Sequence, residues 1–301
     1  MKICVIFNPT ARGDKARRFC EELGKVSGQC TCKPTVAAGS ARTLAAQAVN
    51  EGFDTIVAAG GDGTMNEVLN GIGDAADGFE RARLGVLPFG TVNVFARELR
   101  IPPRFTDAWE TLQDGAEIQI DLPQAEFCLN GTPQVRYFAQ MAGAGWDGRA
   151  VELVQWELKK RVGKYAYIVA GLKAWLGTLP MVTAANGEQT VRGPLVLVGN
   201  GTRYGGDWAF FPRADLQDGV LEVTCFPSLS WVGVLRGVFG LLTKRLYSLG
   251  GVKHFRAKTL ELSSASPVWL QLDGENVARL PARLSVRPKV LRVICGRSRE
   301  T

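Results

Sequence analysis

The chain has 301 residues, a net charge of +7, seven cysteines and a single histidine. This length is enough for about two domains, and the scattered, odd-numbered cysteines do not form a disulfide or zinc pattern. No run approaches the roughly 18 apolar residues of a membrane-spanning helix, while the positive charge favours an anionic partner such as nucleic acid, anionic lipid or a polyphosphate.

The first third of the sequence alternates between apolar strand-like runs and helical segments. The opening MKICVIFNPT contains too short an apolar run for a signal peptide, so we interpret it as a buried strand of a cytoplasmic protein. The expected strands are 2–7, 54–59 and 83–88, and the expected helices are 13–25, 40–51 with Ser40 as N-cap, 65–73 and 91–99. This alternation predicts an α/β domain with a parallel sheet and helices on both faces. Such sheets bind ligands at the carboxyl ends of their strands.

The pattern changes near residues 120–125. The later segments are short, rich in β-forming residues and separated by turns: 135–142, 194–199, 220–226, 259–263, 268–272 and 284–294. They predict a mainly antiparallel sheet or β-sandwich, interrupted by helical segments near 148–177 and 229–247. We therefore expect one domain over 1–122 and a second over 123–301, whose last strands could return to the first domain.

A glycine loop follows the second expected strand directly. It reads Gly60-Gly61-Asp62-Gly63-Thr64, and Thr64 with Glu67 forms the T-x-x-E pattern of a capping box. A glycine turn between a strand and a helix N-terminus directs backbone N–H groups and the helix dipole at one point, which suits a phosphate. The loop is neither a Walker A motif nor a dinucleotide fingerprint, and a tight turn without a ligand remains the alternative. A carboxylate beside a phosphate would need a cation such as Mg²⁺ between them.

Two further loops lie at the ends of neighbouring expected strands. Asn8-Pro9-Thr10 follows the first strand, and 88–93 (PFGTVN) follows the third. Each alone is an ordinary turn. Because the carboxyl ends of parallel strands meet at one edge of the sheet, we expect the three loops to converge on one crevice.

The ordered motifs F-N-P, G-G-D-G-T, P-x-G-T-x-N-x-x-A-R and L-D-G-E resemble the diacylglycerol kinase catalytic family, which includes bacterial lipid kinases and the sphingosine and ceramide kinases. The glycine loop alone is shared with NAD kinases and phosphofructokinases, whereas the ordered set is more specific and covers nearly the whole chain. The resemblance implies ATP- and Mg²⁺-dependent phosphorylation of a lipid hydroxyl. It also implies an NAD kinase/phosphofructokinase-like α/β domain followed by a β-sandwich, with the active site between them.

The resemblance assigns roles to particular residues. The ATP site would comprise Asn8, Thr10, Thr43, Gly60, Gly61, Asp62, Gly63, Thr64, Glu67, Gly90, Thr91 and Asn93. Asp273 in LQLDGE would be the general base for the lipid hydroxyl, with Glu275 supporting it or the metal. Asp273-Gly274 is also typical of a hairpin turn, and both can be true because a base at a hairpin tip can face the crevice.

The resemblance also implies two metal-related features. Asp62 would coordinate the Mg²⁺ of the nucleotide. Asp215, Asp218 and Val220 would hold a structural Mg²⁺, unless Asp218-Gly219 is simply a turn. One departure is Val94, because many bacterial members have Asp at that place. In those members the Asp would help to organise water molecules near the metal, and the side chain of Val94 cannot do this.

The segment 228–258 contains six Lys or Arg and no Asp or Glu, with apolar and aromatic residues between them. This composition suits a helix on an anionic membrane surface, and 151–178 is similar; the alternative is an amphipathic helix packed on the second domain. We expect a lipid substrate, peripheral contact with the cytoplasmic membrane face and a possible homodimer. Nucleic acid is not expected, because it explains the charge but not the glycine loop. The rival functions are a sphingoid-base or ceramide kinase, and an inactive nucleotide- or membrane-binding regulator.

Overall fold

A computed structural model of the chain describes all residues except 10–20, 147, 149–179, 244, 249–250 and 297–301. The chain divides into two compact units. Unit 1 contains Met1–Leu122 and Pro288–Thr301, and unit 2 contains Pro123–Arg287. The expected helix at 148–177 lies almost entirely outside the described residues, as does most of the one at 13–25, of which residues 21–25 are helical.

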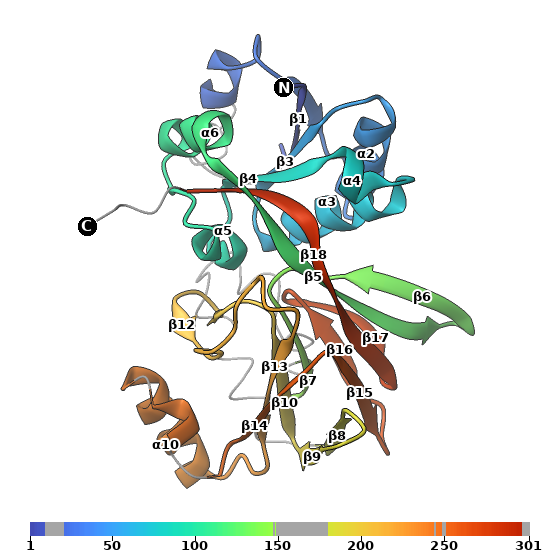
Figure 1. The fold of residues 1–301 in the computed structure, drawn as a ribbon, viewed down its shortest axis with the longest axis vertical. Coiled ribbons are helices and arrows are strands. Elements are labelled where there is room, and N and C mark those ends of the chain that lie inside the picture. The colour runs from blue at the N-terminus through green and yellow to red at the C-terminus, as the bar shows by residue number, and fades with distance from the viewer. Residues whose placement is uncertain (10–20, 147, 149–179, 244, 249–250, 297–301) are drawn as a thin grey trace. The chain divides into compact units, whose positions relative to one another are not determined.

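Unit 1 is built on a parallel sheet with the order β2-β1-β3-β4, of which Figure 1 labels β1, β3 and β4. Its strands are β1 (Ile3–Phe7), β2 (Thr31–Pro34), β3 (Thr55–Gly60) and β4 (Arg83–Pro88). The last strand of the chain, β18 (Ala282–Cys295), extends this sheet beside β4, with Val293 opposite Leu84 in parallel register. The central strands are almost fully buried, as expected when helices cover both faces of a parallel sheet.

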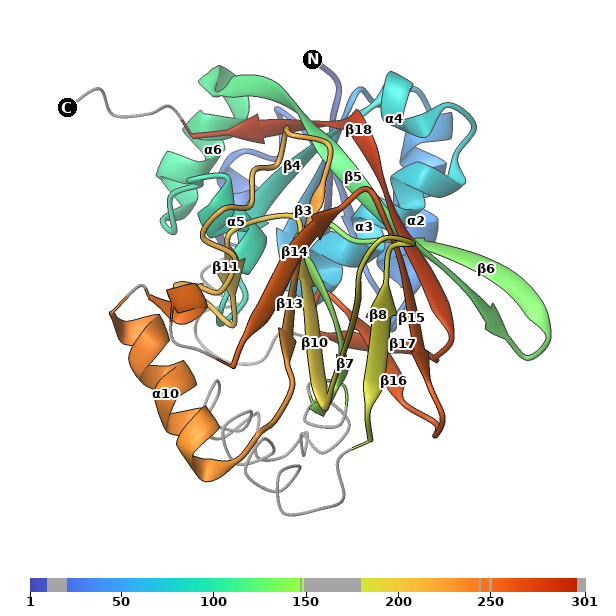
Figure 2. The same ribbon diagram turned by 60° about the horizontal axis from the view of Figure 1, so that its bottom comes forward.

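Helices cover both faces of the unit 1 sheet: α2, α3 and α4 lie on one side and α5 and α6 on the other (Figures 1 and 2). Their bounds are α2 (Ser40–Asn50), α3 (Asp62–Asp74), α4 (Gly78–Arg81), α5 (Val94–Glu98) and α6 (Phe105–Asp114). Helices α2 and α3 approach closely, because a Cβ at Gly71 would lie 2.1 Å from the carbonyl oxygen of Arg42. The predicted α/β domain is confirmed.

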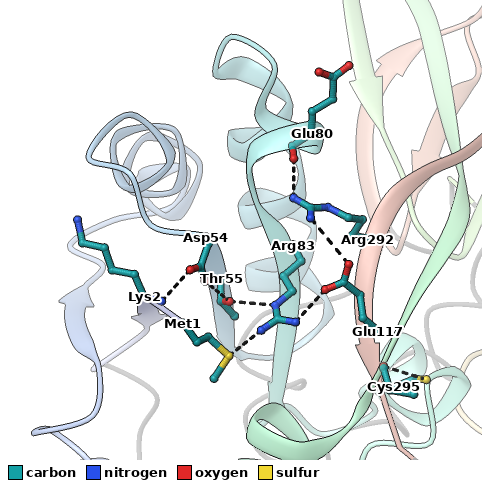
Figure 3. A network of polar contacts seen from close by, with 10 residues as sticks. Met1, Lys2, Asp54, Thr55, Glu80, Arg83, Glu117, Arg292 and Cys295 are labelled. Atoms are coloured by element: carbon teal, nitrogen blue, oxygen red, sulfur yellow. Dashed lines mark hydrogen bonds and ion pairs between the residues drawn. The ribbon is translucent and has the colours of Figure 1, made fainter.

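A polar network lies at one end of this sheet (Figure 3). Arg83 Nη1 pairs with Glu117 Oε2 at 2.8 Å, and Arg292 Nη2 donates to the carbonyl oxygen of Glu80 at 2.6 Å. Because Arg292 belongs to β18 and also lies 3.8 Å from Glu117 Oε1, the network holds the C-terminal strand against the N-terminal part of the unit.

Unit 2 is a β-sandwich of mainly antiparallel strands. One sheet has the order β14-β13-β10-β7-β16-β17, and the other side contains β9-β8-β15 beside the start of β18, with the hairpin β5/β6. The bounds are β5 (Ala116–Leu129), β6 (Thr132–Tyr137), β7 (Met141–Gly145), β8 (Val182–Ala185), β9 (Thr190–Gly193), β10 (Leu195–Gly199), β13 (Leu221–Phe226), β14 (Lys253–Ala257), β15 (Thr259–Ser264), β16 (Trp269–Leu272) and β17 (Glu275–Arg279). A small ribbon joins β11 (Arg203–Tyr204) and β12 (Trp208–Ala209). Fully buried residues such as Val196, Val223 and Leu260 pack between the sheets, which confirms the predicted sandwich.

Several expected elements of unit 2 differ from the structure. The single strand expected over 135–142 is two strands, β6 and β7, and the chain leaves the β6 hairpin before β7 joins the other sheet. The helical region expected over 229–247 is α10 (Trp231–Leu242) followed by the short η1 (Leu246–Ser248). The basic segment to 258 is therefore not one helix, because its last part is β14. Among the helices of the described residues, none has the length and apolar character to cross a bilayer.

Candidate active site

The glycine loop ends β3 and begins α3. Helix α3 begins at Asp62 with Gly61 as its N-cap, and a glycine has no side chain with which to cap the helix. The first backbone hydrogen bond of the helix runs from the amide of Met65 to the carbonyl of Gly61 at 3.1 Å. The first amides of a helix have no acceptor within it, so those of Gly63 and Thr64 are placed to bind an anion at the positive end of the helix dipole.

The predicted capping box is wrong. Thr64 is the third residue of α3 rather than its N-cap. Its hydroxyl oxygen would lie 2.5 Å from a Cβ added to Gly60. Glu67 instead accepts hydrogen bonds from the amides of Gly39 (2.8 Å) and Ala41 (3.0 Å) at the start of α2. Two carboxylate oxygens thereby satisfy amides at the N-terminus of the neighbouring helix.

The N-cap expected at Ser40 is also different. Ser40 is the first residue of α2, and Gly39 is the N-cap, with a φ of 83°. The Ser40 hydroxyl accepts from the amides of Val36 and Ala37 and donates to the carbonyl of Ala37. It therefore closes the turn before the helix, while Glu67 supplies the cap.

The loop after β4 packs directly on the glycine loop. The carbonyl of Gly60 accepts hydrogen bonds from the amides of Phe89 (2.9 Å) and Gly90 (3.1 Å). A Cβ on Gly90 would lie 2.5 Å from the Cα of Gly61, and one on Gly61 would lie 3.3 Å from the Cα of Gly90. Glycine is therefore required at Gly90 because no side chain fits between the two backbones.

Asn93 closes the second loop. It has a φ of 52° as the N-cap of α5, and its Nδ2 donates to the carbonyl of Gly90 at 2.8 Å. Its Oδ1 is buried and has no hydrogen-bond partner among the residues that the structure describes. A buried acceptor without a donor is costly, so this atom is suited to a ligand donor.

Asp62 lies beside this pair of loops. Its Oδ1 is 3.4 Å from the amide of Phe95 in the first turn of α5, which is a long hydrogen bond. The described residues contain no cluster of three His, Cys, Asp or Glu side chains that could enclose a metal. An ion here would take one carboxylate from Asp62 and its remaining ligands from phosphate oxygens and water, as Mg²⁺ commonly does. The residues present therefore fit a nucleotide-bound Mg²⁺.

The other predicted nucleotide residues also belong to unit 1. Asn8 is exposed immediately after β1, Thr43 is exposed on α2, and Thr91 is exposed in the loop before Asn93. Asn8 and Thr91 thus follow the carboxyl ends of β1 and β4, as the sequence predicts. Thr10 lies outside the described residues.

Asp273 is at the tip of the β16/β17 hairpin in unit 2. Asp273 and Gly274 have φ values of 46° and 92°, as a two-residue hairpin turn requires. The Asp273 carboxylate accepts hydrogen bonds from three consecutive amides, those of Ala139 (2.8 Å), Gln140 (3.0 Å) and Met141 (3.0 Å). The hairpin interpretation is thus confirmed, and the three donors stabilise the charged carboxylate. Glu275 is exposed at the start of β17.

The predicted structural metal residues are engaged in local contacts. Asp215 Oδ1 accepts from the amide of Gln217 at 3.0 Å, and Asp218 Oδ1 accepts from the amide of Val220 at 3.1 Å. Asp218 Oδ2 forms an ion pair with Arg256. A cation at this turn would have to compete with the Arg256 guanidinium, so the turn alternative explains these residues without a metal.

Sequence reasoning missed two buried acids. Asp121 is completely buried and accepts from the amide of Lys289 at 2.8 Å; an Asp within the apolar run IDL was its only signal. Glu222 is 1% exposed, and burial raises its pKa, against the hydrogen bond from the amide of Arg213. The single histidine, His254, stacks on Tyr247 with ring centroids 4.2 Å apart, which places it in a packing role.

Comparisons with known proteins match both units. The family model of the diacylglycerol kinase catalytic domain matches residues 2–125. The model of the YegS C-terminal NAD kinase beta sandwich-like domain matches residues 140–295, which is more than half of the chain.

Individual relatives match along most of their length. A diacylglycerol kinase of Staphylococcus saprophyticus is 28% identical over 289 residues, covering 92% of this chain and 90% of the relative. A diacylglycerol kinase of Staphylococcus aureus strain RF122 is 29% identical over 296 residues, covering 92% and 87%.

Two solved structures from Bacillus anthracis strain Sterne share the fold. One has a TM-score of 0.80 and 22% identity, covering 98% of this chain and 95% of that one. The other, described as a diacylglycerol kinase, has a TM-score of 0.69 and 21% identity, covering 98% and 97%.

Proposed function

Because the chain belongs to the diacylglycerol kinase catalytic-domain family, we propose that this lipid kinase transfers the γ-phosphate of ATP to the hydroxyl of diacylglycerol or a related lipid alcohol. The products are the lipid phosphate and ADP. The observation that carries the proposal is the N-terminus of α3, where the N-cap is Gly61 and the backbone of Gly90 packs against that glycine.

Unit 1 would bind the nucleotide through its backbone. The amides of Gly63 and Thr64 donate to the phosphates. The Oδ1 of Asn93, which has no hydrogen-bond partner among the described residues, accepts from a nucleotide donor. Bound Mg²⁺ would neutralise phosphate charge, and Asp62 is the carboxylate that would hold it. Asn8 and Thr91 at the neighbouring strand ends would line the same site, and Thr43 would approach it from α2.

Unit 2 would handle the lipid acceptor. We assign Asp273 to the acceptor hydroxyl, as the base that takes its proton. The three amides that donate to its carboxylate fix its position. Positioning is the larger requirement, because phosphoryl transfer proceeds through a loose transition state that needs little covalent assistance from the protein. The lipid places this reaction at the cytoplasmic face of a membrane, where ATP is present.

The test is transfer of labelled γ-phosphate from Mg-ATP to lipids in mixed micelles. The panel contains diacylglycerol, monoacylglycerol, ceramide, sphingosine and phosphatidylglycerol, with NAD as a soluble control. Strong labelling of diacylglycerol or monoacylglycerol is the expected result. Labelling of ceramide or sphingosine instead would move the acceptor to the sphingoid class, and labelling of NAD alone would overturn the lipid assignment.

A further inference from the structure

Helix α10 presents its large apolar side chains to solvent. Figures 1 and 2 show it at the periphery of unit 2, next to β13 and β14. The outward side chains are between 49% and 66% exposed: Trp231, Val232, Leu235, Val238, Phe239 and Leu242. Five of them follow the spacing i, i+4, i+7, i+8, i+11 of a single helical stripe. The described exposed face of this helix is therefore apolar, with Arg236 as its charged residue.

The opposite face of α10 is built largely from glycine. Gly233, Gly237 and Gly240 face the unit together with Leu241, which packs against the apolar cluster around Phe226. A Cβ on Gly233 would lie 3.3 Å from the carbonyl of Ser228, and Gly240 is buried. A surface helix normally has the reverse arrangement, with large apolar residues inward. Glycine lowers the stability of a helix and has no apolar side chain to bury in the core. The large apolar side chains of α10 therefore lie on the solvent side of the helix rather than in the core of the unit.

A basic pocket adjoins this face. It has a volume of about 340 Å³ and lies between α10 and the segment that enters β14. Arg236 from the helix and Lys253 from the strand both line it, beside apolar atoms of Val232 and Phe226. Between Glu222 and Glu261 the sequence has six Lys or Arg and no acid. Of these cations, Arg256 is paired with Asp218.

We propose that α10 is a membrane-docking helix that inserts its outward apolar face into the interfacial region of an anionic bilayer, while Arg236 and Lys253 bind a phospholipid phosphate. This deepens the proposed function, on which it rests, by assigning the surface that reaches the lipid. Twelve residues extend about 18 Å, so the helix lies along the interface rather than spanning it. Trp231 at its start is a residue type favoured at the membrane–water boundary.

Charge decides between a bilayer and a second copy of the chain. A two-fold dimer through α10 would bring the same surface of each copy together, and with it two copies of the same acid-free basic segment. Anionic headgroups complement that charge, and polybasic segments add to membrane affinity. A bilayer is therefore the occupant that fits both the apolar face and its basic flank.

The experiment is sedimentation of the full-length protein, without ATP, with vesicles of phosphatidylcholine alone or mixed with phosphatidylglycerol. The triple variant L235S/F239S/L242S should lose binding by roughly tenfold or more, because affinity scales with the apolar area inserted. The matched control V36S/L129S/V135S removes three exposed apolar residues elsewhere and should bind as the wild type does. R236Q/K253Q should reduce binding to the vesicles that contain phosphatidylglycerol and leave binding to pure phosphatidylcholine vesicles unchanged.

The outcomes separate the possible occupants. Unchanged vesicle binding by L235S/F239S/L242S would overturn the proposal, and an altered sedimentation coefficient with unchanged vesicle binding would assign the face to a second copy. Equal binding of R236Q/K253Q and wild type to anionic vesicles would overturn the phosphate assignment. Circular dichroism confirms that each variant is folded. Since vesicle binding is measured without phosphate transfer, failure of the proposed kinase reaction would appear only in the micelle assay.

Discussion

Each unit has an Asp-Gly dipeptide near the end of a buried strand: Asp62-Gly63 in unit 1 and Asp273-Gly274 in unit 2. The first site offers hydrogen-bond donors, whereas the second offers an acceptor. At Asp62 a helix begins, and its first amides are donors without an intrahelical acceptor. At Asp273 a hairpin turns, and the carboxylate is the acceptor for three amides of a neighbouring segment. The first site therefore offers donors to a ligand, whereas the second places its carboxylate against donors of the protein itself.

The largest effect is expected at Asp62, because its carboxylate is assigned to a ligand. Asp62→Ala should lower kcat/KM by roughly 100-fold or more and weaken Mg-ATP binding. Asp62 is only half-buried, at the first position of α3, so the urea midpoint of unfolding should change little. Isothermal titration with Mg-ATP and a urea titration measure the two effects. Wild-type nucleotide affinity and turnover in this variant would remove Asp62 from the site.

Gly90→Ala tests the backbone contact between the two loops. The added methyl would lie 2.5 Å from the Cα of Gly61, and such overpacking costs roughly 1–3 kcal/mol. We expect ATP affinity to fall by about 10- to 100-fold, because the loops must separate. Gly28→Ala is the matched control, since a Cβ there meets nothing within 4 Å. If the two variants bind ATP equally well, the loop contact does not shape the nucleotide site.

Part of the order of elements in unit 1 could be predicted from the sequence, because β1, β3, β4, α2, α3 and α5 depend on local patterns, whereas β2, α4 and α6 were not expected. Buried strands, helical spacing and glycine turns are all visible within a few residues, and they locate the glycine loop correctly. The partners of Glu67 could not be predicted in this way, because the amides of Gly39 and Ala41 come from another helix. The sequence pattern indicated a local capping box between Thr64 and Glu67, but in the structure Glu67 binds the start of the neighbouring helix instead.

Unit 2 shows the same limit for longer-range features. The apolar and basic composition of 228–258 indicated an amphipathic helix, but the segment contains both a helix and a strand. Which face of α10 points outward depends on the glycines that pack inward, and periodicity alone does not reveal it. Likewise the D-G pair at Asp273 predicted a turn, but the three amides that bind its carboxylate lie more than 130 residues away in the sequence.

Asp273→Asn tests whether the turn is completed by the carboxylate. One amide of 139–141 would then face the Asn NH₂ group, leaving a donor without an acceptor, at a cost of about 1–3 kcal/mol. The urea midpoint should fall and lipid phosphorylation should be lost, while ATP affinity should be retained because the change lies in unit 2. Gln217→Ala, on an exposed turn, serves as control. Appreciable phosphorylation by a folded Asp273→Asn protein would contradict the base assignment.

Asp54 provides a milder version of the Asp273 arrangement and the smallest expected effect. Partial burial would raise its pKa, but hydrogen bonds from the Thr55 hydroxyl (2.7 Å) and the Lys2 amide (2.9 Å) outweigh it, and the pKa is lowered overall. A carboxyl with a lowered folded-state pKa stabilises the fold above its unfolded pKa of about 3.9, and this contribution is lost as the pH falls through the folded value. Asp54→Asn should therefore reduce stability at neutral pH by less than about 1 kcal/mol, because the group is exposed. Thermal unfolding of the wild type and Asp54→Asn from neutral to acidic pH should show the difference in their stability disappearing below the folded-state pKa of Asp54. A stability difference that does not depend on pH would mean that packing, rather than the charge, accounts for the effect.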